Sequence, residues 1–345
     1  MKAYKKYRDY GFFDQDLRLT KLSQLGDPLE KLNQNIDFEL FRNILEDKLT
    51  KNAKGKGGRP PYDYLMMFKI LILQRYYNLS DFQIEYQIND RMSFMRFLNL
   101  TISDDIPDSK TVWNFREQII DLQIVDLLFD LFVKELEKLG LIVNEGKIID
   151  ASFVEVPRQR NSKQENEEIK KGQTPKSFDE NLNKKSQKDV DARWTQKNKV
   201  NFFGYKNHIK ADSESKIITK YGVTSANVHD SQMLDNLIDD KDKDENLYAD
   251  SAYTGQEQEK IIQEKEMKNK VSEKGYKNKP LTEEQKANNK EKSKTRARVE
   301  HIFGFMEMSM NSMELNYIGL KRVSAAIGLT NLVYNMFRKI QLQAI

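Results

Sequence analysis

The chain has 345 residues, a formal net charge of +4, three histidines and no cysteine. Without cysteine it has no disulfide, thiolate metal site or cysteine nucleophile, and this composition fits a cytoplasmic protein. Three histidines argue against a zinc site, so any metal would be held by carboxylates. The most apolar run, residues 64–73, is too short to span a bilayer. We therefore expect no membrane segment, and the polar start gives no sign of a secretory signal.

Basic residues gather in three segments. Residues 48–59 hold five Lys and Arg and no acid, residues 158–200 hold twelve against seven acids, and residues 265–298 hold twelve against five. One such run is equally typical of a solvated loop, but three separate runs favour a polyanionic partner.

Residues 1–140 read as all-helical. Helical spacing predicts helices at 38–49, at 63–77 and, as one long amphipathic helix, at 109–139. The polar faces of the shorter helices and of the long one carry Arg91, Arg96 and Arg116. This pattern fits a helix-turn-helix-like DNA reader and a plain helical bundle equally well.

After Gly140 the pattern changes to strands. The β-branched, alternating segment 147–156 predicts a strand, and 202–212 with 216–226 predict an antiparallel hairpin. Helices alternate with strands from there on, so residues 141–345 read as an α/β domain. The polar, basic insert at 157–201 is too long for an ordinary connection, and is therefore functional or disordered.

Three carboxylates in this second part form a candidate metal site. Asp150 lies in the apolar segment "KIIDASF", Asp250 in "LYADSAY", and Glu300 in the basic helix that contains "RARVEHIFGF". Each alone is an ordinary strand-end aspartate or surface glutamate. An acid in an apolar strand is nonetheless costly unless it is paired, hydrogen-bonded or bound to a metal. If two neighbouring parallel strands and a helix bring the three together, they match the oxygen ligands that Mg²⁺ and Mn²⁺ prefer.

Six stretches in the same order carry a resemblance to a known family. They include "GGRPPYDYLMMF", "IPDSKTVWNFR", "IIDASFVEVPRQRN", "FGYKNHIKAD", "ADSAYTG" and "RARVEHIFGFM". With them the chain resembles the DDE transposases of bacterial insertion sequences, specifically the insertion-sequence-five family, from about Gly57 to Phe337. The resemblance implies an RNase H-like mixed sheet flanked by helices, preceded by an all-helical domain for DNA binding and dimerisation. It places Asp150 on the first strand, Asp250 after the fourth and Glu300 on a late helix, as catalytic metal ligands.

The activity implied is that of a transposase. Such an enzyme binds the terminal inverted repeats of its element, cuts DNA strands and joins them to target DNA, with Mg²⁺ or substituting Mn²⁺, as two ions. The implied partners are the terminal repeats, the target DNA and a second copy of the chain, and the expected location is the cytoplasm at the nucleoid. We expect DNA contacts from Arg59, Arg158, Arg160, Lys206, Arg296 and Arg298, with Trp194 either stacking on a base or plugging the domain edge.

Two positions depart from the pattern of related sequences. Glu307 stands where relatives often carry a lysine, seven residues after Glu300, and Ser293 stands where some carry a tyrosine. An acid there repels phosphate, which keeps open the alternative of a decayed or co-opted DNA-binding protein. The intact carboxylates argue against that alternative. A structure-specific nuclease of the same fold is a third possibility, against which the long helical domain argues.

Overall fold

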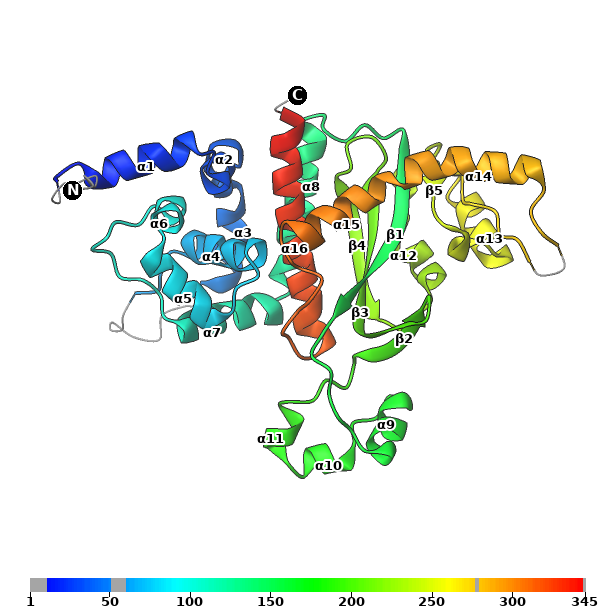
Figure 1. The fold of residues 1–345 in the computed structure, drawn as a ribbon, viewed down its shortest axis with the longest axis horizontal. Coiled ribbons are helices and arrows are strands. Elements are labelled where there is room, and N and C mark those ends of the chain that lie inside the picture. Colours follow the sequence, from blue (N-terminus) through cyan, green and yellow to red (C-terminus); the bar gives the residue numbers. More distant parts are fainter. Residues whose placement is uncertain (1–10, 51–59, 277–278, 344–345) are drawn as a thin grey trace, which may run out of the picture.

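The computed structural model describes residues 11–50, 60–276 and 279–343. A group of short helices lies on one side of the molecule and a mixed sheet lies on the other, with the long helices α8 (Ile124–Lys138) and α16 (Leu320–Gln343) between them (Figure 1). The predicted architecture, an α/β sheet flanked by helices after a helical first part, is confirmed. Within the described residues, no helix has the length and apolar character needed to cross a membrane.

The first part is helical throughout, as its spacing predicts. Its elements are α1 (Asp14–Gln24), α2 (Pro28–Asn35), η1 (Phe38–Phe41), α3 (Arg42–Leu49), α4 (Tyr64–Tyr76), α5 (Asp81–Asp90), α6 (Met92–Leu98) and α7 (Ser109–Asp121), followed by α8. The single helix predicted for 109–139 is wrong, because the chain breaks between α7 and α8. Gln123 adopts a left-handed backbone with φ of 52°, which interrupts the helical hydrogen bonds and redirects the chain.

The arginines of these helices are engaged within the bundle. Arg96 pairs with Asp27 at 2.7 Å, and Arg116 pairs with Asp81. The guanidinium of Arg91, which directly precedes α6, lies 5.6 Å from the ring centre of Tyr77, which directly follows α4. These contacts join neighbouring helices, so the three arginines stabilise the helical bundle.

The sheet has six strands: β1 (Gly146–Glu155), β2 (Arg193–Lys197), β3 (Val200–Asp212), β4 (Ile218–Ser225), β5 (Asn246–Tyr248) and β6 (Lys268–Asn269). Strand β3 is antiparallel to β1 on one side and to β2 and β4 on the other. Strand β5 is parallel to β1, and β6 is parallel to β5. The predicted hairpin is β3–β4, whereas β2 has no counterpart in the sequence prediction.

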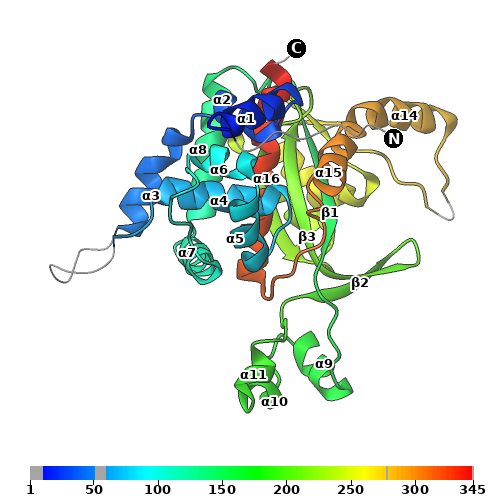
Figure 2. The same ribbon diagram turned by 60° about the vertical axis from the view of Figure 1, so that its left-hand side comes forward.

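Short and long helices surround the sheet. They are α9 (Lys163–Lys170), α10 (Lys176–Asp179), α11 (Leu182–Lys185), η2 (Asp230–Met233), α12 (Leu234–Leu237), η3 (Asp240–Asp242), η4 (Ser251–Tyr253), α13 (Gln256–Glu264), α14 (Glu283–Arg296), α15 (Arg298–Met308) and α16. The insert at 157–201 contains α9 to α11 and β2, and its helices project below the sheet (Figures 1 and 2). The insert is therefore a small folded unit.

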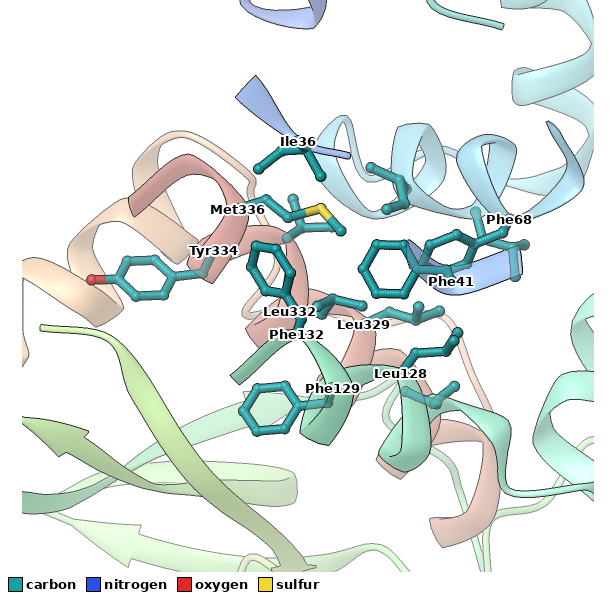
Figure 3. Packing of buried hydrophobic residues seen from close by; sticks show 14 of the residues in the cluster. Ile36, Phe41, Phe68, Leu128, Phe129, Phe132, Leu329, Leu332, Tyr334 and Met336 are labelled. Atoms are coloured by element: carbon teal, nitrogen blue, oxygen red, sulfur yellow. The ribbon is translucent and has the colours of Figure 1, made fainter. Parts of the chain in front are cut away.

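Helix α16 provides the shared core. It packs against α8, β4, α4 and α2, and so joins elements from both parts of the chain. Figure 3 shows the central contacts, in which Phe41 and Phe68 of the helical part meet Phe132 of α8 and Leu332 of α16. Because one buried cluster runs through both parts, the helical part and the sheet are packed as one body, and the division at residue 140 stays a prediction.

Two buried asparagines on α16 satisfy polar groups of the sheet. Asn335 accepts a hydrogen bond from the Ile218 N–H (2.9 Å) and donates one to the Ile218 carbonyl (2.8 Å). The register between β3 and β4 shifts beside this point, which leaves the Ile218 backbone facing the helix. Asn331 exchanges hydrogen bonds with Asn207 of β3 at 2.9 and 3.2 Å.

Replacing Asn335 tests this polar contact. We expect Asn335→Leu to lower the free energy of unfolding by about 2–4 kcal/mol, since it leaves a buried N–H and a buried carbonyl without partners. Urea unfolding measures the loss. Asn89→Leu on the exposed face of α5 is the control and should change stability little. An equal loss in both variants would contradict the argument.

Histidine His208 is fully buried in β3. Its Nε2 lies 2.8 Å from the Thr224 Oγ1, and its Nδ1 has no hydrogen-bond partner among the described residues. Burial lowers the pKa of His208 to about 4. The unfolded chain therefore takes up a proton at higher pH than the folded one does, and protonation favours unfolding.

This histidine predicts acid sensitivity. The contribution of His208 to stability is complete above pH 6.5 and is lost as the pH falls toward 4, by up to about 3 kcal/mol. We expect His208→Gln to flatten that part of the pH dependence, measured by urea unfolding at steps between pH 7 and 4. His301→Gln, at an exposed position, should leave the curve unchanged. A wild-type slope in His208→Gln would refute the prediction.

Candidate active site

Strands β1 and β5 place two carboxylates beside each other. Their parallel register pairs Ile148 with Tyr248, and Asp150 and Asp250 each lie two residues beyond that pair. Strand β5 ends at Tyr248, and the Oδ1 of Asp250 accepts a hydrogen bond from the Ala252 N–H at 2.8 Å, which starts η4. The neighbouring parallel strands expected from the sequence are therefore present, with Asp150 on β1 and Asp250 two residues after the end of β5.

The carboxyl group of Asp150 is electrostatically strained. Burial raises its pKa to about 6, and the charge of Asp250 adds to the rise. The Ala151 N–H, 2.8 Å from Oδ1, and the nearby Arg296 act in the opposite direction. A half-buried acid with a like charge beside it gains stability from any cation that binds between the two.

Arg296 is the cation that contacts Asp150 in this structure. It ends helix α14, and its Nη1 lies 3.4 Å from the Oδ2 of Asp150. The next helix, α15, starts at Arg298 and packs against β1. The sequence stretch "RARVEH" thus reaches the first carboxylate through its first residue.

Glu300 lies in the first turn of α15 and is exposed. In the part of the chain that the structure describes, no three histidine, aspartate or glutamate side chains are grouped closely enough to hold a metal ion. The structure therefore brings together Asp150 and Asp250, and leaves Glu300 outside that pair. The role of Glu300 as third ligand stays a prediction.

The residues expected to contact DNA have different surroundings. Lys206 is buried and bonds to Asp230 and to the Val228 carbonyl, both at 2.7 Å, so its charge is already matched within the protein. Arg298 donates to the Ser213 carbonyl at 2.7 Å and pairs with a glutamate in the same turn. Both side chains stabilise the fold.

The candidate DNA-binding residues that face solvent lie in the insert at 157–201. Arg158 and Arg160 are exposed, and the Arg158 guanidinium lies 5.5 Å from the ring centre of Trp194. Trp194 is half exposed and packs against Phe203 of β3. Arg59 lies outside the described residues.

Sequence reasoning did not single out Tyr253. It is buried three residues after Asp250, and its hydroxyl has no hydrogen-bond partner among the described residues. Burial raises the pKa of Tyr253, and the charges of Asp230, Asp150 and Asp250 add to this. Its ring therefore forms part of the wall beside the two carboxylates. The stretch "ADSAYTG" could have pointed to Tyr253, because it places this aromatic residue three positions after Asp250.

The exposed side chain of Glu307 lies two turns after Glu300 on α15. Ser293 is partly buried in α14, and its hydroxyl donates to the Lys290 carbonyl at 2.9 Å. The two departures from the related sequences thus lie on the two helices that flank Arg296.

Comparison with known proteins gives two family matches. Residues 143–336 match the family described as "Transposase DDE domain", and residues 17–118 match "Transposase domain (DUF772)". Among solved structures, the chain is similar to a piggyBac transposase synaptic complex with hairpin DNA. The sequence identity is 14% and the TM-score 0.43, over 93% of this chain and 76% of that one. The first family match covers more than half of the chain.

The protein belongs to the DDE transposase family. Members act on DNA, which they cut and join by transesterification with divalent metal ions, and this chain is therefore a metal-dependent transposase. The carboxylates of this site suit a divalent metal ion. Asp150 and Asp250 offer hard carboxylate oxygens, and the raised pKa of Asp150 reflects repulsion that a divalent cation relieves.

Replacing Asp150 tests its strained charge. The folded-state pKa of about 6 lies above the ordinary 3.8, so the ionised side chain lowers stability above pH 6 and has no such effect below about 3.8. We expect Asp150→Asn, in metal-free buffer, to raise the free energy of unfolding at pH 7 by about 1–3 kcal/mol. The gain should vanish near pH 4. Asp235→Asn, at an exposed position, is the control; a gain that persists at pH 4 would exclude this cause.

Proposed function

We propose that this transposase belongs to the insertion-sequence-five family, binds the terminal inverted repeats of its element, and transfers the cut ends to target DNA. The observation that carries the proposal is the placement of Asp150 on β1 and of Asp250 just after the adjacent parallel strand β5, with Arg296 against Asp150. Helical and catalytic parts packed on one core also suit an enzyme that must hold a DNA end at its own active site.

In this proposal Asp150, Asp250 and Glu300 hold two Mg²⁺ ions, for which Mn²⁺ substitutes. Such ions supply an activated water or 3′-hydroxyl and stabilise the leaving oxygen of the phosphodiester. The position of Glu300 on the helix that packs against β1, four residues after Arg296, supports its assignment. The pair Asp150 and Asp250 provides the binding site that Glu300 completes.

Other residues position the DNA. Arg296 neutralises Asp150 in the absence of metal, and its guanidinium is free to bind a phosphate oxygen once metal neutralises that carboxylate. Arg158 and Arg160 are exposed in the insert and suit backbone phosphates, while Trp194 offers a ring for stacking. We assign Lys206 and Arg298 to positioning the fold around the site, because both are engaged by neighbouring protein groups.

Residues 1–140 are proposed to recognise the element's ends and to contribute to dimerisation. Two ends must be cut and joined together, so the active form is proposed to be a homodimer on DNA, working at the nucleoid. The basic segments 158–200 and 265–298 supply the positive field that attracts the DNA.

Substitution of the three carboxylates tests the site. We expect Asp150→Asn, Asp250→Asn and Glu300→Gln each to lower strand cleavage on a labelled transposon end by several orders of magnitude, while end binding persists. Double variants should be hardly worse than single ones, since the ligands act as a unit. Glu291→Gln, exposed on α14, is the matched control for Glu300→Gln. Near-normal cleavage by any one variant would remove that residue from the site.

A further inference from the structure

Two phenylalanine rings stack on the sheet outside the hydrophobic core. Phe153 of β1 and Phe202 of β3 have ring centres 4.3 Å apart and planes inclined by only 10°. Both side chains are half-buried, and neither belongs to or packs against any of the three hydrophobic clusters formed by the described residues. The pair therefore exposes flat apolar ring surface to solvent and takes no part in the hydrophobic core.

Two lysines lie beside this pair. The Nζ of Lys206 is 5.3 Å and that of Lys197 5.8 Å from the ring centre of Phe153. Asp230 neutralises Lys206. Lys197 is exposed at the last position of β2, beside the β2–β3 turn, and forms no ion pair with another described residue. One uncompensated positive charge therefore stands at the edge of the aromatic surface.

The pair lies close to the proposed catalytic carboxylates along one strand. Phe153 follows Asp150 by three residues, roughly 10 Å along β1, so its ring leaves the strand on the face opposite to Asp150. The last register pair between β1 and β5 includes Ile148, so β5 does not cover the β1 edge between the carboxylate and the rings. The β2–β3 hairpin that carries Lys197 and Phe202 projects freely from the sheet (Figure 2). A DNA strand at Asp150 can therefore reach the rings by crossing this open edge to the other face of the sheet.

We propose that the Phe153–Phe202 pair is a stacking site for an unpaired base of the DNA strand next to the cleaved phosphodiester, with Lys197 contacting an adjacent phosphate. The inference rests on the proposed function and adds a substrate subsite to it. Flat aromatic surface with a flanking cation matches the repeating base and phosphate of single-stranded DNA, and every base offers a face to it. The competing role is a cross-strand aromatic pair that only stabilises the sheet.

Site-directed variants separate the two roles. The probe is a fluorescent single-stranded oligothymidylate of twelve nucleotides, with anisotropy as the readout and the melting temperature of each variant measured in parallel. We expect Phe202→Leu to weaken binding about tenfold and Phe202→Trp to retain it. Lys197→Gln should weaken binding and reduce its salt dependence, whereas Lys199→Gln, in the β2–β3 turn, should do neither. Wild-type affinity in Phe202→Leu, with only a lower melting temperature, would overturn the stacking site.

Photocrosslinking locates the contact directly and needs no variant. Oligonucleotides carrying 5-iodouracil at successive positions beside the cleavage point are irradiated with the wild-type protein, and crosslinked peptides are mapped by mass spectrometry. Crosslinks to Phe153 or Phe202 support the proposal, and crosslinks confined to other segments overturn it. Cleavage of a duplex transposon end by the same wild-type protein reports on the proposed function separately. An enzyme that cuts ends without crosslinking at the rings refutes the subsite alone.

Discussion

The fold depends on the burial of α16 between the helical part and the sheet. Leu332 and its neighbours meet Phe132 of α8 and Phe41 of the helical part, so that one apolar cluster joins both halves of the chain. A helix buried on nearly all sides must also satisfy the polar groups that it covers. Asn335 does this for the Ile218 backbone at the point where the β3–β4 register shifts. This packing fixes the sheet, and with it β1, relative to the helices around it.

The two carboxylates proposed to be catalytic are held in place at a cost in stability. Asp150 is half-buried beside Asp250, and its raised pKa measures the repulsion that the fold maintains without metal. Arg296 relieves part of that repulsion from the end of α14. The same three groups suit a site that binds a divalent cation and then phosphate, because the cation relieves the repulsion between the carboxylates and leaves Arg296 able to pair with a phosphate.

Several sequence predictions are confirmed by the structure and others are wrong for identifiable reasons. Alternating β-branched residues predict β1, and the neighbouring parallel strand that the carboxylate argument assumed is present as β5. The helix predicted for 109–139 fails at Gln123, because hydrophobic periodicity continues through a left-handed residue that only the backbone reveals. Lys206 was expected to contact DNA, but the fold buries it against Asp230, a partner 24 residues away.

The sequence by itself determined the family and the helical and α/β parts, and it singled out Asp150 and Asp250 as candidate ligands, since local periodicity and motif order carry that information. The tertiary structure alone decided how the parts share a core, which cations are already neutralised, and that Asp150 contacts Arg296 from 146 residues away. It also decided that Phe153 and Phe202 stack outside the core. Such pairings depend on strand register and helix packing, which join residues with no sequence signal for each other.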